Sequence, residues 1–152
     1  MKMEGAIDEP IQLSFPLPRS LDTKIHLRLS IKSKVIMLFL TTVSADDDDK
    51  AVPMGSFVYA LPDKYNSSQP LSTTIYSVEA TLEFTTRLAK ILAKKTQMPV
   101  YVGNSISLAN TGLGGTVEEE MEALKRVVEV TLDKLQGVIK SPTALPNGTS
   151  SS

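Results

Sequence analysis

The chain has 152 residues, 41% of them hydrophobic and 22% charged, which is ordinary for a single globular domain. Its formal net charge of −1 gives no electrostatic reason to expect a nucleic acid or an anionic membrane as partner. The absence of Cys excludes disulfides, thiolate nucleophiles and thiolate metal sites. Residues 1–10 contain no apolar stretch of signal-peptide length, and no apolar run approaches the about 20 residues of a membrane span. We therefore expect a soluble protein of the cytoplasm, with the nucleus as a second compartment.

The first part of the chain is expected to form strands after a disordered segment, residues 1–10. Residues 11–15 alternate apolar and polar side chains and predict a short strand that ends before Pro16, because proline cannot donate to a strand ladder. Residues 25–31 alternate in the same way and predict a strand with one polar face. The dipeptide Lys32-Ser33 is expected to turn the chain directly into a further strand over residues 34–43.

That further strand contains six consecutive apolar residues, 35–40. Successive side chains of a strand point to opposite faces of the sheet, so a strand with one wet face should alternate between apolar and polar residues. This strand does not alternate, and both of its faces should be covered. The rest of the chain can cover only one of them, which predicts that the other face packs on a partner protein. The pattern leaves two sets of partner-facing residues open: Val35, Met37 and Phe39, or Ile36, Leu38 and Leu40.

The middle of the chain contains a loop and two more predicted strands. The run Asp46 to Asp49 is expected to form a solvated acidic loop. Residues 56–61 predict a strand with Phe57, Tyr59 and Leu61 on one side, and residues 71–76 predict a short strand.

Two helices are predicted in the last part of the chain. The first covers residues 78–96, and Pro99 ends it and opens a strand over residues 100–106. Thr116, with Glu119 three residues later, matches a capping box that begins the second helix, and Gly137 is its expected C-cap. The tail, residues 139–152, is rich in Ser, Thr, Pro and Gly and is predicted to be disordered.

This order predicts a single α+β domain over residues 11–138, because the strands come mainly before the helices. We expect an antiparallel sheet with two helices on one face. The other face would pack on a partner subunit, so that the chain forms half of a β-sandwich heterodimer.

No group of residues in the sequence predicts catalysis, a metal site or a cofactor. His26 is the only histidine, and it alternates with Lys24 and Arg28 on a predicted strand. Catalysis by histidine needs a nucleophile or a carboxylate within hydrogen-bond reach, and metal sites usually need several ligands. We therefore interpret His26 and Arg28 as sheet-surface residues that would contact a partner if this face is an interface.

The glycine-rich loop 110–116 lies between a strand and a helix, where phosphate-binding loops occur. Its spacing lacks the Lys of a Walker loop, and the helix that follows begins with three carboxylates, Glu118 to Glu120, which would repel a phosphate. A small-ligand or nucleotide-binding domain that uses this loop is therefore an alternative hypothesis.

Two segments of the sequence carry a family resemblance. Residues 88–96, LAKILAKKT, lead into residues 99–104, PVYVGN, and residues 118–123, EEEMEA, lie in the last helix. The chain resembles the proteasome assembly chaperone 4 family in its fungal-type form over residues 11–135. The resemblance implies a small α+β subunit without enzymatic activity or cofactor. It implies pairing with proteasome assembly chaperone 3 through sheet faces, with the helices outside.

The resemblance further implies that the pair binds proteasomal α subunits and promotes α-ring assembly of the 20S core particle. Tyr101 and Asn104 lie at the end of the best-matching segment and are its candidate contact residues. A homodimeric adaptor of similar fold is a second alternative.

Overall fold

The computed structural model describes residues 10–17, 20–44, 55–108 and 115–139, and these form six strands and two helices. This confirms the predicted α+β class. The elements in chain order are β1 (Ile11–Leu17), β2 (Ser20–Lys32), β3 (Val35–Ser44), β4 (Ser56–Leu61), β5 (Leu71–Tyr76), α1 (Glu79–Thr96), β6 (Val100–Ser105) and α2 (Val117–Ile139). The acidic run Asp46 to Asp49 lies outside the described residues, as do nearly all of the two segments that we predict to be disordered.

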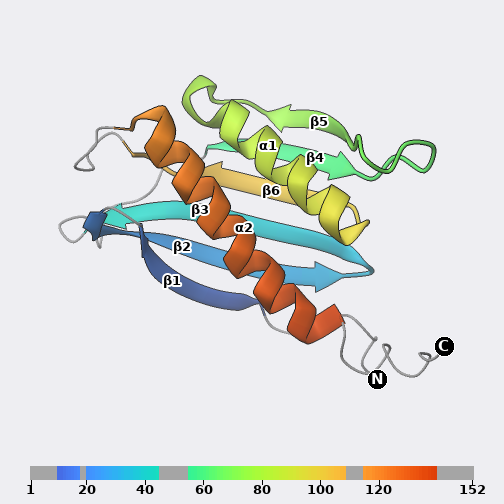
Figure 1. Ribbon diagram of the computed structural model, residues 1–152, viewed down its shortest axis with the longest axis horizontal. Coiled ribbons are helices and arrows are strands. Elements are labelled where there is room, and N and C mark those ends of the chain that lie inside the picture. Colours follow the sequence, from blue (N-terminus) through green and yellow to red (C-terminus); the bar gives the residue numbers. More distant parts are fainter. Residues whose placement is uncertain (1–9, 18–19, 45–54, 109–114, 140–152) are drawn as a thin grey trace.

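The strands form one sheet in the order β1-β2-β3-β6-β4-β5 (Figure 1). All neighbours are antiparallel except the central pair, β3 and β6, which is parallel with Ile36 opposite Val100 and Thr41 opposite Ser105. The expected purely antiparallel sheet is therefore wrong in its centre. The chain enters β6 from α1, and a helical crossover lets a strand join the sheet in the same direction as β3. The sequence pattern of residues 100–106 predicts a strand, but it does not predict the direction in which that strand joins the sheet.

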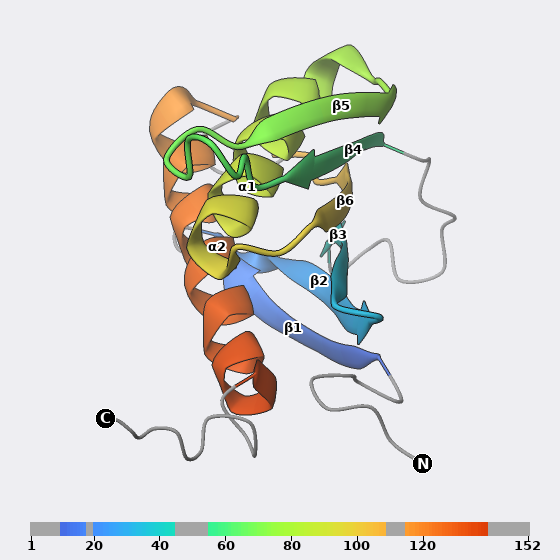
Figure 2. The same ribbon diagram turned by 90° about the vertical axis from the view of Figure 1, so that its right-hand side faces the viewer.

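Both helices lie on the same face of the sheet, as the sequence predicts (Figure 2). Helix α1 packs on β4 and β6, while α2 crosses over β1, β2 and β3 (Figure 1). One contiguous apolar core fills the space between helices and sheet. Its largest fully buried apolar side chains are Leu17, Ile25, Leu29, Ile31, Ile36, Leu38, Val58, Leu88, Leu92, Val100 and Leu135.

The turn between β2 and β3 is formed by Ser33 and Lys34, which both have positive φ, 53° and 63°. Positive φ at both central residues is typical of the two-residue hairpin turn whose twist matches that of the strands. The direct connection is confirmed, but the turn lies one residue later than the sequence predicts. Neither residue is the Gly or Asn that usually marks such a turn, which explains why the pattern is weak.

Two predicted element ends differ from the structure. Strand β1 continues through Pro16 to Leu17, because β1 is an edge strand and an edge tolerates a residue without N–H. Helix α2 continues through Gly137 to Ile139, so Gly137 is not its C-cap. A Cβ at Gly137 would meet no atom within 4 Å, and an exposed glycine in the last turn costs a helix only about 1 kcal/mol.

Candidate functional site

The sheet face opposite the helices is covered by no element of the described chain (Figure 2). We call it the open face. Strand alternation and pairing register place these side chains on it: Lys24, His26 and Arg28 of β2, Val35, Met37 and Phe39 of β3, Phe57 and Tyr59 of β4, and Tyr101 of β6. The register thus brings together four strands that are far apart in the sequence.

Four aromatic rings form a continuous row across the open face. The ring of Phe39 stacks on that of Phe57 with 6.1 Å between centroids, and Phe57 stacks on Tyr101 at 5.7 Å. Tyr101 in turn contacts Tyr59 at 4.5 Å. We call Phe39, Phe57, Tyr101 and Tyr59 the aromatic strip. Phe39 remains 42% exposed, so the strip presents apolar surface that the isolated chain does not bury.

Gly103 makes the contact between Phe39 and Phe57 possible. It lies on β6 between the two strands, opposite Phe39 on one side and Phe57 on the other. A Cβ at this position would approach Phe39 Cδ1 to 2.7 Å and Phe57 Cδ1 to 3.5 Å. The rings therefore occupy the space above a residue without side chain, as aromatic residues do beside glycines in sheets.

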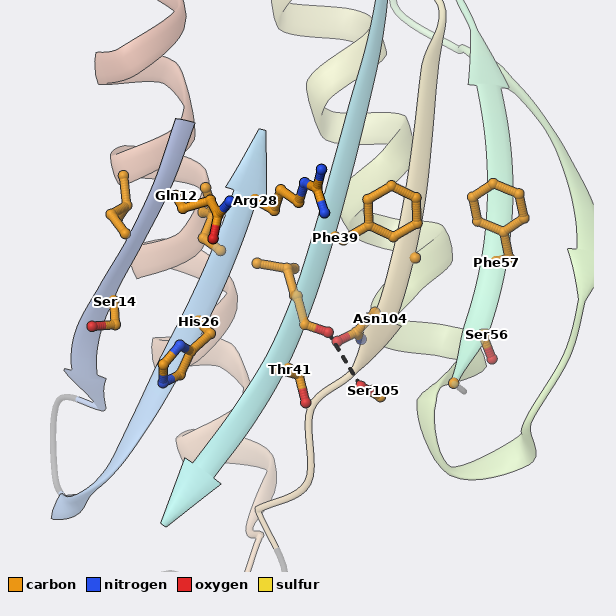
Figure 3. A pocket seen from close by; sticks show the side chains of 15 residues that line it. Gln12, Ser14, His26, Arg28, Phe39, Thr41, Ser56, Phe57, Asn104 and Ser105 are labelled. Atoms are coloured by element: carbon orange, nitrogen blue, oxygen red, sulfur yellow. Dashed lines mark hydrogen bonds between the residues drawn. The ribbon is translucent and has the colours of Figure 1, made fainter. Parts of the chain in front are cut away.

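A concavity of about 500 Å³ lies beside the aromatic strip, over β1, β2, β3, β6 and β4 (Figure 3). One side is polar and carries Gln12, Ser14, His26 and Arg28. The other side carries the rings of Phe39 and Phe57 above Gly103. Arg28 extends from β2 over β3 toward the ring of Phe39 (Figure 3). The open face is therefore apolar in its centre and cationic toward β2.

Comparison with known proteins identifies the kind of protein that carries this face. A family model described as proteasome assembly chaperone 4 matches residues 24–106, which is more than half of the chain. The chain belongs to the proteasome assembly chaperone 4 family. The matched residues begin on β2 and end just after β6, so they include the whole aromatic strip. The family description makes this a proteasome assembly chaperone, and catalysis is no part of that description.

Among solved structures, a chain from the crystal structure of a novel chaperone complex for yeast 20S proteasome assembly has the same fold. Its TM-score with this chain is 0.59 at 12% sequence identity, and the match covers 86% of this chain and 97% of that one. At this identity the likeness concerns the fold alone. No curated protein matches the chain at a significant level.

The structure decides which side of β3 faces outward in this member of the chaperone 4 family. Val35, Met37 and Phe39 lie on the open face. Ile36 and Leu38 are fully buried, and Leu40 is 4% exposed, in the core below the helices. Listing Ile36, Leu38 and Leu40 as partner-facing residues is therefore wrong, because each would have to leave the core to reach a partner.

The other candidate partner-contact residues also divide between the open face and the buried side of the sheet. His26, Arg28 and Tyr101 lie on the open face. Asn104 is 2% exposed and lies below the sheet, where its Nδ2 donates to Thr85 Oγ1 at 3.1 Å and its Oδ1 accepts the Ile106 N–H at 2.9 Å. Its side chain joins β6 to α1 and is not a contact residue for a partner.

The sequence interpretation missed Phe57, Tyr59 and Gly103 as parts of the site. The alternation of residues 56–61 already places the two aromatic residues on one side of a strand. That they meet Phe39 and Tyr101 depends on β6 lying between β3 and β4, which no local pattern encodes.

The alternative nucleotide-binding hypothesis receives no support from the start of α2. Thr116 caps the helix as predicted, since its Oγ1 accepts the Glu119 N–H at 3.2 Å. Glu119 Oε1 accepts the Gly115 N–H at 3.0 Å, and Glu119 is only 2% exposed. A buried carboxylate thus occupies the helix end where a phosphate would bind. Most of the loop itself, residues 109–114, lies outside the described residues.

Within residues 10–17, 20–44, 55–108 and 115–139, no group of three or more His, Asp or Glu side chains is placed to hold a metal ion. Neither described helix is long and apolar enough to cross a membrane.

Proposed function

We propose that this chain is one half of a heterodimeric chaperone. Its open face packs on a proteasome assembly chaperone 3-like subunit, and the pair binds proteasomal α subunits and promotes α-ring assembly of the 20S core particle. The role needs no catalysis and no cofactor. The pair would act in the cytoplasm, with the nucleus as a second compartment.

The aromatic strip is the observation that supports this proposal. The helices cover only one face of the sheet, and the strip lies in the middle of the other. Aromatic side chains that are clustered and partly exposed are typical of the energetic centre of a protein interface. A second sheet packed about 10 Å away would bury the strip and complete a sandwich.

The proposal is tested in cells that lack the native protein and express variants of it. Phe39→Asp should abolish co-purification of the partner subunit and of α subunits, and it should lower the yield of assembled 20S particles on native gels. Tyr65→Asp is the matched control, because Tyr65 is 99% exposed in the loop between β4 and β5, away from the open face. The control should behave as wild type.

Mass spectrometry of the purified wild-type complex identifies the partner. A chaperone 3-like subunit together with α subunits supports the proposal. Purification of the chain with only a second copy of itself would overturn it in favour of a homodimeric adaptor.

A further inference from the structure

One part of the open face is charged. Lys24, His26 and Arg28 follow one another at alternate positions of β2, and all three are exposed. We call them the cationic row. Lys24 and Arg28 give the row its formal charge.

The strands on either side of the cationic row place no charged residue opposite it, and on β2 itself Asp22 is exposed at the alternate position before Lys24. Across β1 the residues opposite Lys24, His26 and Arg28 are Pro16, Ser14 and Gln12, and across β3 they are Val43, Thr41 and Phe39. Among the described residues, neither Lys24 nor Arg28 has an ion-pair or hydrogen-bond partner. Within the part of the chain that the structure describes, the two cations are therefore without a protein partner.

A sheet packed on the open face would remove the water around both cations. Burying a charge without a partner is strongly unfavourable, so covering Arg28 with an apolar surface would oppose the gain from burying the aromatic strip. A carboxylate opposite Arg28 removes this conflict, because the guanidinium can hold it with two parallel hydrogen bonds. The concavity beside Arg28 has room for such a side chain, with the ring of Phe39 against its apolar stem.

We infer that the partner subunit presents carboxylate side chains to the cationic row, with one of them seated in the concavity between Arg28 and Phe39. The inference rests on the proposed function and specifies the chemistry of the partner. Lys24 and Arg28 are four residues apart on β2, which is about 13 Å along a strand, so a facing strand with acidic residues four positions apart would match both of them.

The cationic row also disfavours an ordered pair of identical chains in which β2 faces β2, although it does not prevent weaker association through the aromatic strip. Two copies that met with like strands opposed would set Lys24 and Arg28 against the same cations, and like charges across an interface suppress pairing. The row thus favours a partner of different sequence.

The test uses the full-length chain and the chaperone 3-like subunit, with the dissociation constant measured at low and at high salt. Arg28→Glu and Lys24→Glu should each weaken binding about tenfold or more, with a smaller loss at high salt. The matched control is Lys90→Glu, an identical change of charge on the exposed side of α1. It should leave the dissociation constant unchanged. Arg28→Met keeps much of the apolar stem without the charge and should give an intermediate loss.

Charge-reversal rescue separates a specific contact from a misfolded variant. Each Asp and Glu of the partner's sheet face is changed singly to Arg and tested against Arg28→Glu. At least one of these changes should restore binding to the Arg28→Glu variant while weakening binding to wild type.

Three results would overturn the inference. One is an Arg28→Glu variant that binds as tightly as Lys90→Glu. Another is that a single-stranded RNA oligonucleotide binds the wild-type chain but not the Arg28→Glu variant, while the two chains bind the partner subunit equally well. The third is a wild-type chain that binds no chaperone 3-like subunit, which would overturn the proposed function as well. The first two leave the proposed function intact.

Discussion

Gly103 is the residue over which the rings of Phe39 and Phe57 meet. A methyl group there would lie 2.7 Å from Phe39 Cδ1, so the ring of Phe39 would have to move. That ring is the end of a partly exposed, flexible side chain, and its movement costs the fold little. The arrangement of the aromatic strip, which is the proposed docking surface, therefore depends more on Gly103 than the stability of the chain does.

Gly103→Ala should therefore change the free energy of unfolding by less than about 1 kcal/mol and weaken partner binding about tenfold. Urea unfolding and titration calorimetry measure the two effects. Gly55→Ala is the contrasting variant, because a Cβ there would lie 1.8 Å from the Asn104 carbonyl oxygen, which is backbone and cannot move aside. It should cost about 3 kcal/mol or more in stability. Equal destabilisation by both variants would contradict this explanation.

His26 is exposed on the open face, and no metal-binding group of side chains includes it among the described residues. His26→Gln keeps a side chain that can donate and accept hydrogen bonds. In cells that lack the native protein, this variant should restore proteasome assembly as well as wild type does. A failure to assemble, with normal stability and normal partner binding, would mean that His26 does more than line a surface.

At the scale of the element, alternate residues of β3 lie in the core and on the open face, where we propose that the partner docks. Leu38 is fully buried, whereas Met37 lies on the open face. The two neighbours should thus respond in opposite ways to the same substitution.

Leu38→Asp should destabilise the chain by several kcal/mol, because it places an unpaired carboxylate in the apolar core. Met37→Asp should leave the unfolding midpoint within a few degrees of wild type and weaken partner binding. Thermal unfolding followed by circular dichroism, together with size-exclusion chromatography of the mixed subunits, checks both. A Met37→Asp variant that binds normally would place the interface elsewhere.

Residue periodicity predicts much at this scale. The alternation in residues 25–31 and 56–61 predicts both strands and their faces, and the Thr116 cap predicts the start of α2. The run 35–40 predicts a strand covered on both sides, but a run with no polar residue cannot show which set of alternate residues faces the helices. The extension of β1 through Pro16 depends on its place at the sheet edge, and the burial of Asn104 depends on Thr85 of α1. Both features depend on tertiary contacts, which the local sequence pattern does not encode.

At the scale of the whole molecule, the chain is a sheet with helices on one side and a partly apolar face on the other. Such a face is a liability in a solitary protein, since exposed apolar patches promote association. The isolated chain should therefore self-associate as its concentration rises, or be poorly soluble.

Analytical ultracentrifugation over a range of concentrations measures this. Co-expression with the chaperone 3-like subunit should raise the soluble yield and give a single 1:1 species. Phe39→Asp should reduce self-association of the isolated chain, because it puts a charge in the centre of the aromatic strip. An isolated wild-type chain that stays monomeric and fully soluble at high concentration would argue against an exposed docking face.

The parallel pairing of β3 with β6 has a consequence for the order of events during synthesis. The chain makes β1, β2 and β3 first, and the aromatic strip then contains only Phe39. Phe57 and Tyr59 follow on β4, but Tyr101 of β6 must enter between the two sets of strands before the four rings meet. This pairing joins residues far apart in the sequence, and contacts of that kind close late because a long loop must be ordered first. A nascent or truncated chain that lacks β6 would thus lack the complete aromatic strip, so pairing through the strip should favour chains in which β6 has already entered the sheet.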